Sequence, residues 1–396
     1  MSLKKILFIY PEMFVGGSTT SLLSLFQVLN PDQYQMDLLL MHADGILDRA
    51  IPEYVNVLPC IFPQGKEYLP RMWKGRSPAA LFRRIGIRAY SILLKRKLAR
   101  MQLCNAYFMR FAGTLSEQYD VAISFLEGFP LYYLASNKVV ASKKYAWIHT
   151  DYVKSQFAPI LDKKYFANLD KIIFVADACV NNFVQAVPEF AAKAICIHNI
   201  LDAQNIRDQA GESCENMIVH PQNINFVTAC RIDFSSKALD RAVQVLDRIK
   251  TEHQLTNFCW YIIGDGPDFS VLQQIIADCK LENQIILLGQ KENPCPYIAQ
   301  CNVFFLPSRY EGMPMSITEA QILGVVPLVT QYSSASEQIN HGVDGIIVPN
   351  DEKGIYDGVV KILSSPEIVP RMQKALRQKN FGNEKTISSI QKMLDE

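Results

Sequence analysis

The stretch that decides the fold runs from Pro307 to Pro327 and reads PSRYEGMPMSITEAQILGVVP. This stretch begins directly after an apolar, strand-like run. Within it, Glu311-Gly312-Met313-Pro314 has the composition of a loop. Met315–Leu323 reads as a helix, with Pro314 suited to its first turn and Gly324 to its C-terminal stop. The pattern predicts a strand, a glycine-containing loop and a helix, which is the repeating unit of a parallel α/β sheet.

The same alternation extends over the whole chain of 396 residues. Short apolar runs rich in β-branched and aromatic residues are separated by helix-length segments in both halves, which indicates two parallel sheets built from βαβ units. The clearest predicted strands are Ile6–Tyr10, Met36–Leu40, Val121–Phe125, Lys144–Ile148, Lys171–Val175, Ile224–Ala229, Trp260–Ile263, Gln284–Leu288, Val303–Leu306, Val326–Thr330 and Gly345–Val348.

A polar stretch between residues 199 and 222 separates the two sets of strands. We therefore expect two Rossmann-like domains that face a cleft, residues 1–200 and residues 201–380. Residues 381–396 read as a short polar helix that could pack back on the first domain.

Composition excludes several classes of protein. The net charge of +1 gives no sign of a nucleic-acid binder, and no stretch approaches 18 consecutive apolar residues. Its ten cysteines include no Cys-x-x-Cys pair and none beside a cluster of histidines. That argues against a disulfide framework and against a zinc site, and it favours a reducing, cytoplasmic compartment.

One segment, residues 68–116, differs from the rest of the chain in its charge. It holds eleven lysines and arginines, interleaved with aromatic and aliphatic residues, and no aspartate or glutamate. One interpretation is a docking surface for anionic lipid or for a pyrophosphate-linked lipid. The other is a solvated basic insertion, which the lack of one clean apolar stripe favours.

The loop and helix start after Leu306 suit a ligand that carries phosphate and sugar groups. Backbone N–H groups at a helix N-terminus favour an anion, and Gly312 permits a close approach of the backbone. Glu311 and Glu319 flank this element, and carboxylates accept hydrogen bonds from neighbouring sugar hydroxyls.

Glu311 and Glu319, with seven residues between them, resemble the E-x7-E motif of retaining GT-B glycosyltransferases, notably glycosyltransferase family 4 (group 1). The resemblance implies that Glu311 contacts the donor sugar and Glu319 the ribose. It also implies that the amides of Gly312 and Met313, beside Pro314, lie near the sugar or the β-phosphate. The whole string from Ser308 to Ala320 is far more specific than the two glutamates alone.

Two cations upstream are candidates for neutralising the leaving diphosphate. Arg231 ends a strand-like run and Lys237 follows six residues later, where family members often carry Gly-Arg and then Lys; Cys230 replaces that glycine here. Cations placed where negative charge develops stabilise a transition state, and they could replace a metal ion. We therefore expect no metal and no cofactor beyond the nucleotide-sugar substrate.

Two further loops follow strands of the second half. Gly264-Asp265-Gly266-Pro267 is similar to a Gly-x-Gly-Pro that lines the cleft in the family, so Asp265 is a donor-side candidate. Lys291 is a candidate contact of the nucleobase, because the resemblance places the base near it. Either loop could also be an ordinary turn with solvated side chains.

The first half offers its own candidates after predicted strands. Gly16-Gly17 precedes a helix, and the family brings such a pair close to the donor phosphates or the acceptor; the spacing does not fit NAD binding. His149 follows a strand where the family often has a histidine near the donor sugar. Asp151 and Glu127 are acceptor-side candidates, and a satisfied core histidine and tight turns are the alternatives.

The predicted activity is that of a retaining, metal-independent hexosyltransferase of cell-surface glycan synthesis, such as capsule or lipopolysaccharide. Its partners would be a nucleotide-sugar, UDP-linked by family prevalence, and a lipid-linked or saccharide acceptor, with no nucleic acid. The expected location is the inner face of the membrane, as a peripheral protein. The alternatives are a GT-B nucleotide-sugar epimerase or hydrolase, and a non-catalytic membrane-bound partner.

Overall fold

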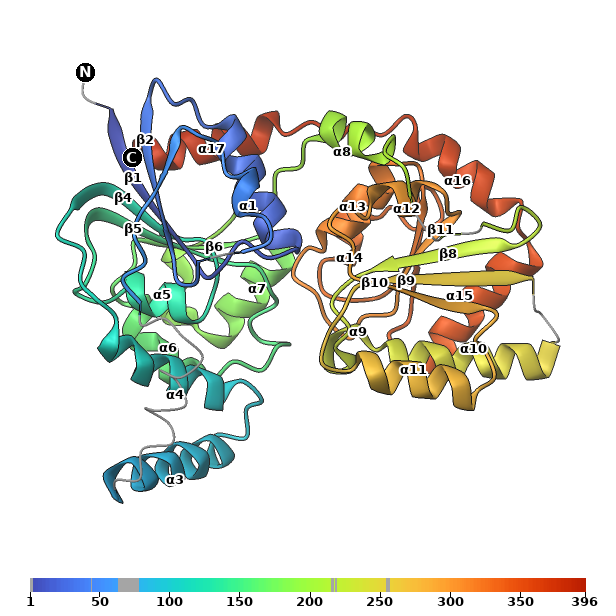
Figure 1. The fold of residues 1–396 in the computed structure, drawn as a ribbon, viewed down its shortest axis with the longest axis horizontal. Helices are drawn as coiled ribbons and strands as arrows, with labels where there is room; N and C mark the ends of the chain where they lie inside the picture. Colours follow the sequence, from blue (N-terminus) through green and yellow to red (C-terminus); the bar gives the residue numbers. More distant parts are fainter. Residues whose placement is uncertain (1–2, 44, 63–77, 215–216, 218, 254–256) are drawn as a thin grey trace. The chain divides into compact units, whose positions relative to one another are not determined.

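The computed structural model describes residues 3–396 except 44, 63–77, 215–216, 218 and 254–256, and it describes residues 78–84 by backbone alone. The chain divides into two compact units (Figure 1). Unit 1 comprises residues 1–200 and 385–396, and unit 2 comprises residues 201–384. Each is an α/β unit around one parallel sheet, so the predicted fold class is confirmed.

Unit 1 contains a seven-stranded parallel sheet with the strand order β3-β2-β1-β4-β5-β6-β7. Its strands are β1 (Lys4–Tyr10), β2 (Tyr34–Leu40), β3 (Val55–Val57), β4 (Gln118–Ser124), β5 (Val140–Ile148), β6 (Lys171–Phe174) and β7 (Ala194–Cys196). Its helices are α1 (Gly17–Val28), α3 (Pro78–Leu93), α4 (Ala99–Phe108), α5 (Phe129–Leu134), α6 (Pro159–Phe166), α7 (Asp177–Ala186) and α17 (Glu384–Asp395).

Unit 2 contains a six-stranded parallel sheet with the order β10-β9-β8-β11-β12-β13. Its strands are β8 (Ile224–Ala229), β9 (Phe258–Ile263), β10 (Ile285–Gly289), β11 (Val303–Leu306), β12 (Val326–Thr330) and β13 (Ile346–Val348). Its helices are α8 (Ala203–Ala210), α9 (Phe234–Lys237), α10 (Leu239–His253), α11 (Phe269–Asp278), α12 (Cys295–Ala299), α13 (Met315–Ile322), α14 (Ala335–Gln338), α15 (Glu352–Ser364) and α16 (Ile368–Leu376).

Both faces of the second sheet are buried, which explains why its strands read as continuous apolar runs. Phe226, Trp260 and Phe305 belong to a core shared with α10, α11, α15 and α16. Their sequence neighbours Val227 and Phe304 point into a second core with α12, α13 and α14. The alternation follows from the twofold repeat of a strand, and it places helices on both faces of the sheet.

The C-terminal helix α17 packs on unit 1. Its residues Ile390, Met393 and Leu394 are buried, and the hydroxyl of Tyr145 donates to the carbonyl oxygen of Met393 at 3.1 Å. Lys171 also forms an ion pair with Glu396. The sequence pattern predicted a polar helix here, and the structure shows instead that one face of it is apolar and buried.

Most predicted strands agree with the observed ones to within a few residues, and the list of clearest strands lacks the two short strands β3 and β7. Part of the basic segment, residues 68–77, lies outside the described residues. In the described part of the chain, no helix is both long enough and apolar enough to cross a bilayer.

Candidate functional site

The strand order of unit 2 determines where its loops meet. The order reverses between β8 and β11, and ligands of open parallel sheets gather at the carboxyl ends of the strands beside such a switch point. The β8–α9 loop carries Arg231 and leads to Lys237, and the β11–α13 loop carries Glu311. The topology therefore brings three of the predicted site residues to one edge of one sheet.

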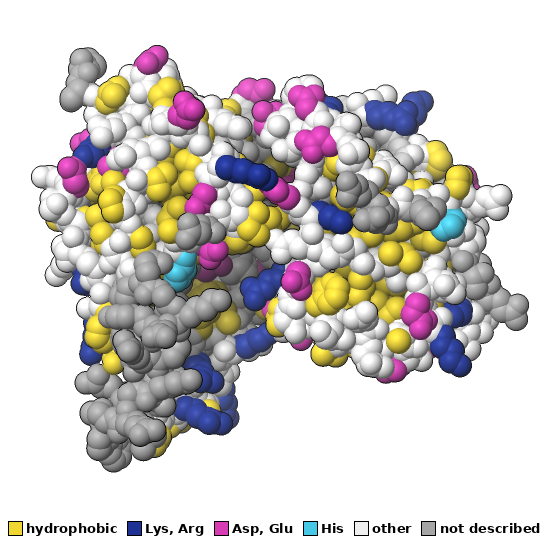
Figure 2. All heavy atoms as spheres, viewed as in Figure 1, with side chains coloured by type: hydrophobic (Ala, Val, Ile, Leu, Met, Phe, Trp, Pro, Cys, Tyr) yellow, Lys and Arg dark blue, Asp and Glu magenta, His cyan; other side chains and the backbone are white. Residues whose placement is uncertain are grey.

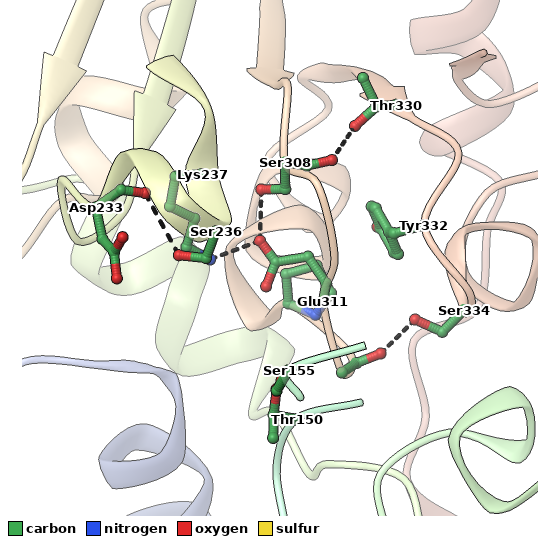
Figure 3. A network of polar contacts seen from close by, with 12 residues as sticks. Thr150, Ser155, Asp233, Ser236, Lys237, Ser308, Glu311, Thr330, Tyr332 and Ser334 are labelled. Atoms are coloured by element: carbon green, nitrogen blue, oxygen red, sulfur yellow. Dashed lines mark hydrogen bonds and ion pairs between the residues drawn. The ribbon is translucent and has the colours of Figure 1, made fainter. Parts of the chain in front are cut away.

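Lys237 and Glu311 form the centre of this edge (Figure 3). The Nζ of Lys237 lies 2.6 Å from Oε1 of Glu311, and the Ser308 hydroxyl donates to the same oxygen at 2.6 Å. Only 19% of the Lys237 side chain and 11% of the Glu311 side chain are exposed. Burial works to lower the pKa of Lys237, but the Glu311 carboxylate, together with Cys230 and Tyr310, outweighs it, so the pKa is raised and the ammonium stays charged.

The backbone around Lys237 is held from both ends. Asp233 caps α9, since its carboxylate accepts from the amide of Ser235 at 2.8 Å. Ala238 then adopts a left-handed conformation with φ of 53°, which ends α9 directly after Lys237. The amide of Arg309 donates to the carbonyl oxygen of Ser236 at 2.7 Å and so ties the two loops together.

Arg241 and Asn350 fix the beginning of the β11–α13 loop. The buried guanidinium of Arg241 donates to the carbonyl oxygen of Pro307 and to Oδ1 of Asn350, both at 2.9 Å. Asn350 donates in turn to the carbonyl oxygens of Ser308 and Arg309, at 3.1 and 2.9 Å. The sequence alone did not indicate these two residues, because neither lies in a motif and each is more than 40 positions from the loop residues that it contacts.

The loop continues to the N-terminus of α13, where Gly312, Met313 and Pro314 lie. Pro314 is the residue before the first turn, with φ of −65° and ψ of 117°, rather than a member of that turn. The side chain of Ser334 donates to the carbonyl oxygen of Gly312, and Nε2 of Gln338 donates to that of Pro314 at 3.0 Å. Two side chains from the β12–α14 region thus orient the peptides whose amides the sequence assigned to the donor.

Glu319 lies in the second turn of α13 and has a different environment from Glu311. Burial raises the pKa of its carboxyl group to about 7. The carboxyl group is therefore close to half protonated at neutral pH, and it can either donate or accept a hydrogen bond. A ligand with adjacent hydroxyl groups would favour the ionised form.

The glycines beside Asp265 allow two loops to touch. A Cβ atom on Gly264 would lie 1.9 Å from the carbonyl oxygen of Cys230, and one on Gly266 would lie 2.3 Å from that of Ile232. Gly264 also has φ of 140°, which disfavours any side chain. The β9–α11 loop therefore supports the loop that carries Arg231, whose side chain is exposed.

Asp265 is exposed, and its carboxylate accepts from the amide of Gly266 at 2.7 Å. Lys291 lies over the ring of Tyr297, with its Nζ 5.2 Å from the ring centroid. Asp265 follows β9 and Lys291 follows β10, and both strands belong to the sheet of unit 2. The proposed contacts of these two residues with the donor remain predictions.

In unit 1 the strand order reverses between β1 and β4, and Gly16, Gly17 and Glu127 follow these two strands. Gly16 is the residue before α1, and Gly17 begins that helix. The hydroxyl group of Tyr10 lies 2.7 Å from the hydroxyl oxygen of Ser18, which fixes the turn against β1. The three candidates thus lie at the edge of the sheet where a ligand is expected.

Glu127 and His149 are in contact. Oε2 of Glu127 accepts from the backbone amide of His149 at 2.9 Å. The imidazole packs against the ring of Phe125, with centroids 5.0 Å apart, and burial lowers its pKa to about 4. Its Nε2 is buried and has no hydrogen-bond partner among the described residues. A neutral imidazole with one unsatisfied nitrogen is poised to bind a polar group.

Asp151 lies in the loop after β5, and its acceptor-side role stays a prediction. Its side chain is fully buried, and Oδ1 accepts from the amides of Val153 and Lys154 at 3.1 and 3.0 Å. Oδ2 accepts from the side chain of Asn182 at 2.7 Å. The carboxylate accepts hydrogen bonds from amides of its own loop, and these bonds order the segment after His149.

Comparisons with known proteins bear on both units. Residues 220–379, nearly all of unit 2, match the family model described as glycosyl transferases group 1. The N-acetyl-alpha-D-glucosaminyl L-malate synthase of Bacillus anthracis is 24% identical over 216 residues, which cover 53% of each chain.

A Campylobacter jejuni relative is the N-acetylgalactosamine-N,N'-diacetylbacillosaminyl-diphospho-undecaprenol 4-alpha-N-acetylgalactosaminyltransferase. It is 24% identical over 246 residues, 60% of this chain and 63% of that protein. The match thus spans about half to three-fifths of the length of these two relatives.

Among solved structures, Anabaena HepE in complex with UDP-glucose superposes with a TM-score of 0.69 at 17% identity, over 99% of both chains. Identity this low establishes the fold alone, which is GT-B. Residues 220–379 thus resemble the group 1 glycosyl transferases, and the whole chain has the GT-B fold.

Proposed function

We propose that this chain is a retaining glycosyltransferase of family 4, which moves a hexose-type sugar from a nucleotide-sugar to a lipid-linked or saccharide acceptor in cell-surface glycan synthesis. The observation that carries the proposal is the half-buried Lys237–Glu311 pair at the switch point of unit 2, inside the region that matches the group 1 model. A fixed cation beside a carboxylate suits a ligand with a diphosphate next to a sugar.

The departing group would be a nucleoside diphosphate, and Lys237 and Arg231 would neutralise its developing charge. In that arrangement the acceptor hydroxyl attacks from the face that the diphosphate leaves, and the leaving phosphate oxygen takes its proton. The transition state resembles an oxocarbenium ion, as in glycoside cleavage. The protein supplies positioning and electrostatic stabilisation through Lys237, the amides at the start of α13, and Glu311 on the sugar.

His149 is our candidate in unit 1 for orienting the donor sugar. Its imidazole is neutral, and its Nε2 is the buried nitrogen that lacks a partner among the described residues. A sugar hydroxyl could donate to or accept from this nitrogen, depending on the tautomer. Gly16, Gly17 and Glu127 would lie near the phosphates or the acceptor.

A UDP-sugar is the donor that we favour. The structural relative from Anabaena binds UDP-glucose, and Glu319 offers a carboxyl group poised to ionise when ribose hydroxyls donate to it. Lys291 and Tyr297 would then lie near the base.

The proposed acceptor is lipid-linked, since the Campylobacter jejuni relative acts on a diphospho-undecaprenol substrate. Exposed basic side chains of α3, α4 and the segments beside them could hold the enzyme at an anionic cytoplasmic membrane surface. They are Arg88, Lys95, Arg96, Lys97, Arg100 and Arg110. Figure 2 shows lysine and arginine side chains gathered over α3 and α4.

Exposed apolar side chains of the same region could insert between lipid headgroups. They are Ile85, Tyr90, Ile92, Leu93, Met101 and Phe111.

A direct test is a thermal-shift panel of UDP-, GDP- and ADP-sugars, since a ligand at 100 times its dissociation constant stabilises by about 2.7 kcal/mol. The stabilising sugar is then incubated with a lipid-diphosphate acceptor, and the anomeric configuration of the product is read by NMR. Retention of the donor anomer supports the proposal. Consumption of the donor at full rate without acceptor would favour the epimerase or hydrolase alternative instead.

Metal independence is tested separately. The rate of transfer is measured in excess chelator and after addition of Mg²⁺ or Mn²⁺. We expect the same rate in all three, because Lys237 and Arg231 replace the metal at the diphosphate. A rate that requires added metal would contradict this part of the proposal.

A further inference from the structure

Three side chains of metal-binding type meet at the edge of the sheet in unit 1. They belong to Asp177, Cys196 and His198, and one ligand atom from each lies within 4.8 Å of the other two. Asp177 and His198 are exposed, and Cys196 is half-buried. The sequence analysis argued against a zinc site because it found no histidine cluster beside a cysteine, and folding assembles such a group from two separate elements.

The register of the last two strands explains the meeting. Phe174 of β6 pairs with Cys196 of β7, and the amide of Ile197 donates to the carbonyl oxygen of Phe174 at 2.9 Å. Asp177 begins α7, which follows β6 after two residues, and its carboxylate lies beside Cys196 of β7. Cys196 and His198 are two positions apart, which places their side chains on the same side of an extended chain.

We propose that Asp177, Cys196 and His198 form a binding site for Zn²⁺, separate from the donor site of unit 2. A thiolate, an imidazole and a carboxylate are three of the ligand types that zinc prefers, and the soft thiolate selects against Mg²⁺ and Ca²⁺. Three protein ligands leave the fourth tetrahedral position to a water molecule.

The geometry requires only a small adjustment. Zinc bonds of about 2.0–2.3 Å place neighbouring ligand atoms about 3.5 Å apart in a tetrahedron. The ligand atoms lie within 4.8 Å of one another, so the distances between them have to shorten by about 1 Å at most. Rotation of the exposed Asp177 and His198 side chains can supply this change.

The charges also balance. Binding displaces the thiol proton of Cys196 to solvent, so one thiolate and one carboxylate neutralise Zn²⁺. Without that neutralisation, a cation beside the first turn of α7 would be opposed by the helix dipole.

Such an ion would join the last strand of the sheet to the start of α7. Asn199 follows one residue after His198, and unit 1 passes into unit 2 after Ile200. The site would therefore stabilise the edge of unit 1 from which the chain leaves for unit 2.

The experiment uses the full-length protein, first freed of metal by chelation. Co²⁺ is added as a spectroscopic stand-in for zinc, and Zn²⁺ is then titrated in to displace it. We expect one ion per chain, with the ultraviolet absorption of a cobalt–thiolate bond and the visible bands of a tetrahedral ion. Zinc should abolish both signals.

Three variants identify the ligands: Cys196→Ser, His198→Ala and Asp177→Asn. Cys196→Ser should remove the thiolate absorption. Each variant should weaken zinc binding by more than the roughly 10–100-fold typical of losing an outer-shell partner. Cys60→Ser, which alters another half-buried cysteine of unit 1, is the matched control and should bind like the parent.

Circular dichroism of each metal-free variant establishes that it is folded. Absence of a thiolate signal in the parent would overturn the proposal, and so would zinc binding that survives all three substitutions. Donor binding and transfer are assayed in chelator, so failure of the zinc site leaves the proposed transferase activity untouched.

Discussion

The ammonium of Lys237 and the carboxylate of Glu311 neutralise each other at 2.6 Å, although they come from loops that are 74 positions apart in the sequence. Ser308 shares the same carboxylate oxygen (Figure 3). A sugar diphosphate entering this edge would offer the ammonium a stronger anion and the carboxylate a set of hydroxyl donors. In the ligand-free protein the ion pair therefore compensates both charges, so neither is left unpaired in a half-buried site.

Replacing Lys237 tests this relationship. We expect Lys237→Ala to lower kcat by about 10²–10³-fold, the typical cost of removing one group that stabilises transition-state charge. Lys237→Arg should restore part of the rate, because it keeps the charge with a different shape. Steady-state kinetics with the donor found by the thermal-shift panel is the measurement.

The matched control is Lys353→Ala, which removes an exposed lysine from the same unit. It should leave kcat and KM unchanged. If Lys237→Ala folded correctly and turned over at the parental rate, the role of Lys237 at the leaving group would be refuted.

Glu319 gives a prediction about pH. Burial raises the pKa of Glu319 from 4.5 to about 7, so the folded protein holds this proton more tightly than the unfolded chain. The resulting stability is fully present below about pH 4.5 and is lost as the pH rises to about 7. Glu319→Gln should match the parent at low pH and exceed its free energy of unfolding above pH 7, by up to about 3 kcal/mol.

Urea unfolding of the ligand-free proteins at several pH values measures this difference. Glu282→Gln, at an exposed position of unit 2, should show no such pH dependence. Calorimetry near pH 7 in buffers of different ionisation enthalpy adds a second readout. Nucleotide binding should release a proton from the parent and not from Glu319→Gln, and equal proton release from both would rule out the ribose contact.

The sequence predicted which strands, loops and helices carry the site residues better than it predicted the contacts between them. The spacing from Glu311 to Glu319 and the strand ends at Arg231 and His149 follow local rules of composition, which one sequence contains. The contacts of Arg241 with the Pro307 carbonyl oxygen and of Asn350 with the Ser308 carbonyl oxygen do not, because they depend on how α10 and the end of β13 pack. Asp151 shows the same limit, since its partner Asn182 comes from α7.

The glycines of the β9–α11 loop were interpreted as a lining of the cleft, and the structure supplies a different reason for them. Ala in place of Gly264 or Gly266 would place Cβ within 2.3 Å of a backbone oxygen of the β8–α9 loop. If the β8–α9 loop yields, Arg231 moves with it, because Arg231 lies between Cys230 and Ile232. We expect either substitution to destabilise unit 2 by several kcal/mol and to weaken nucleotide binding, as thermal melts with and without the donor would show.

Gly86→Ala is the control for these glycines. It lies in α3, where an added Cβ meets nothing within 4 Å, and it should raise helix stability slightly. Normal nucleotide affinity in Gly264→Ala would show that the two loops move independently.

A substitution of Asn350 tests whether a fixed conformation of the β11–α13 loop matters for catalysis. Asn350→Ala removes two hydrogen bonds donated to the β11–α13 loop and one acceptor for Arg241, and the loss of these bonds should cost about 1–3 kcal/mol of stability. Because Asn350 acts through the loop, we expect kcat/KM to fall by about tenfold and Asn350→Asp to rescue only part of it. A loss of stability with unchanged kinetics would make the residue purely structural.

The basic surface between α3 and α4 gives the last prediction. Lys95, Arg96 and Lys97 are consecutive exposed cations, and each basic residue near an anionic membrane contributes about 1 kcal/mol. Reversing all three to glutamate should therefore lower the partition coefficient on phosphatidylserine-containing vesicles by about 100-fold or more. The matched control reverses Lys353, Arg371 and Lys374, three exposed cations of unit 2.

Co-sedimentation at low and high salt measures the binding, and the control triple should bind like the parent. Salt should weaken binding of the parent, because screening shortens the reach of the exposed charges. Activity on a short water-soluble acceptor should be unaffected in both triples, since the substituted residues lie outside the donor site. If the parent did not sediment with anionic vesicles at low salt, α3 and α4 would be a solvated insertion and the acceptor would have to reach the enzyme without this surface.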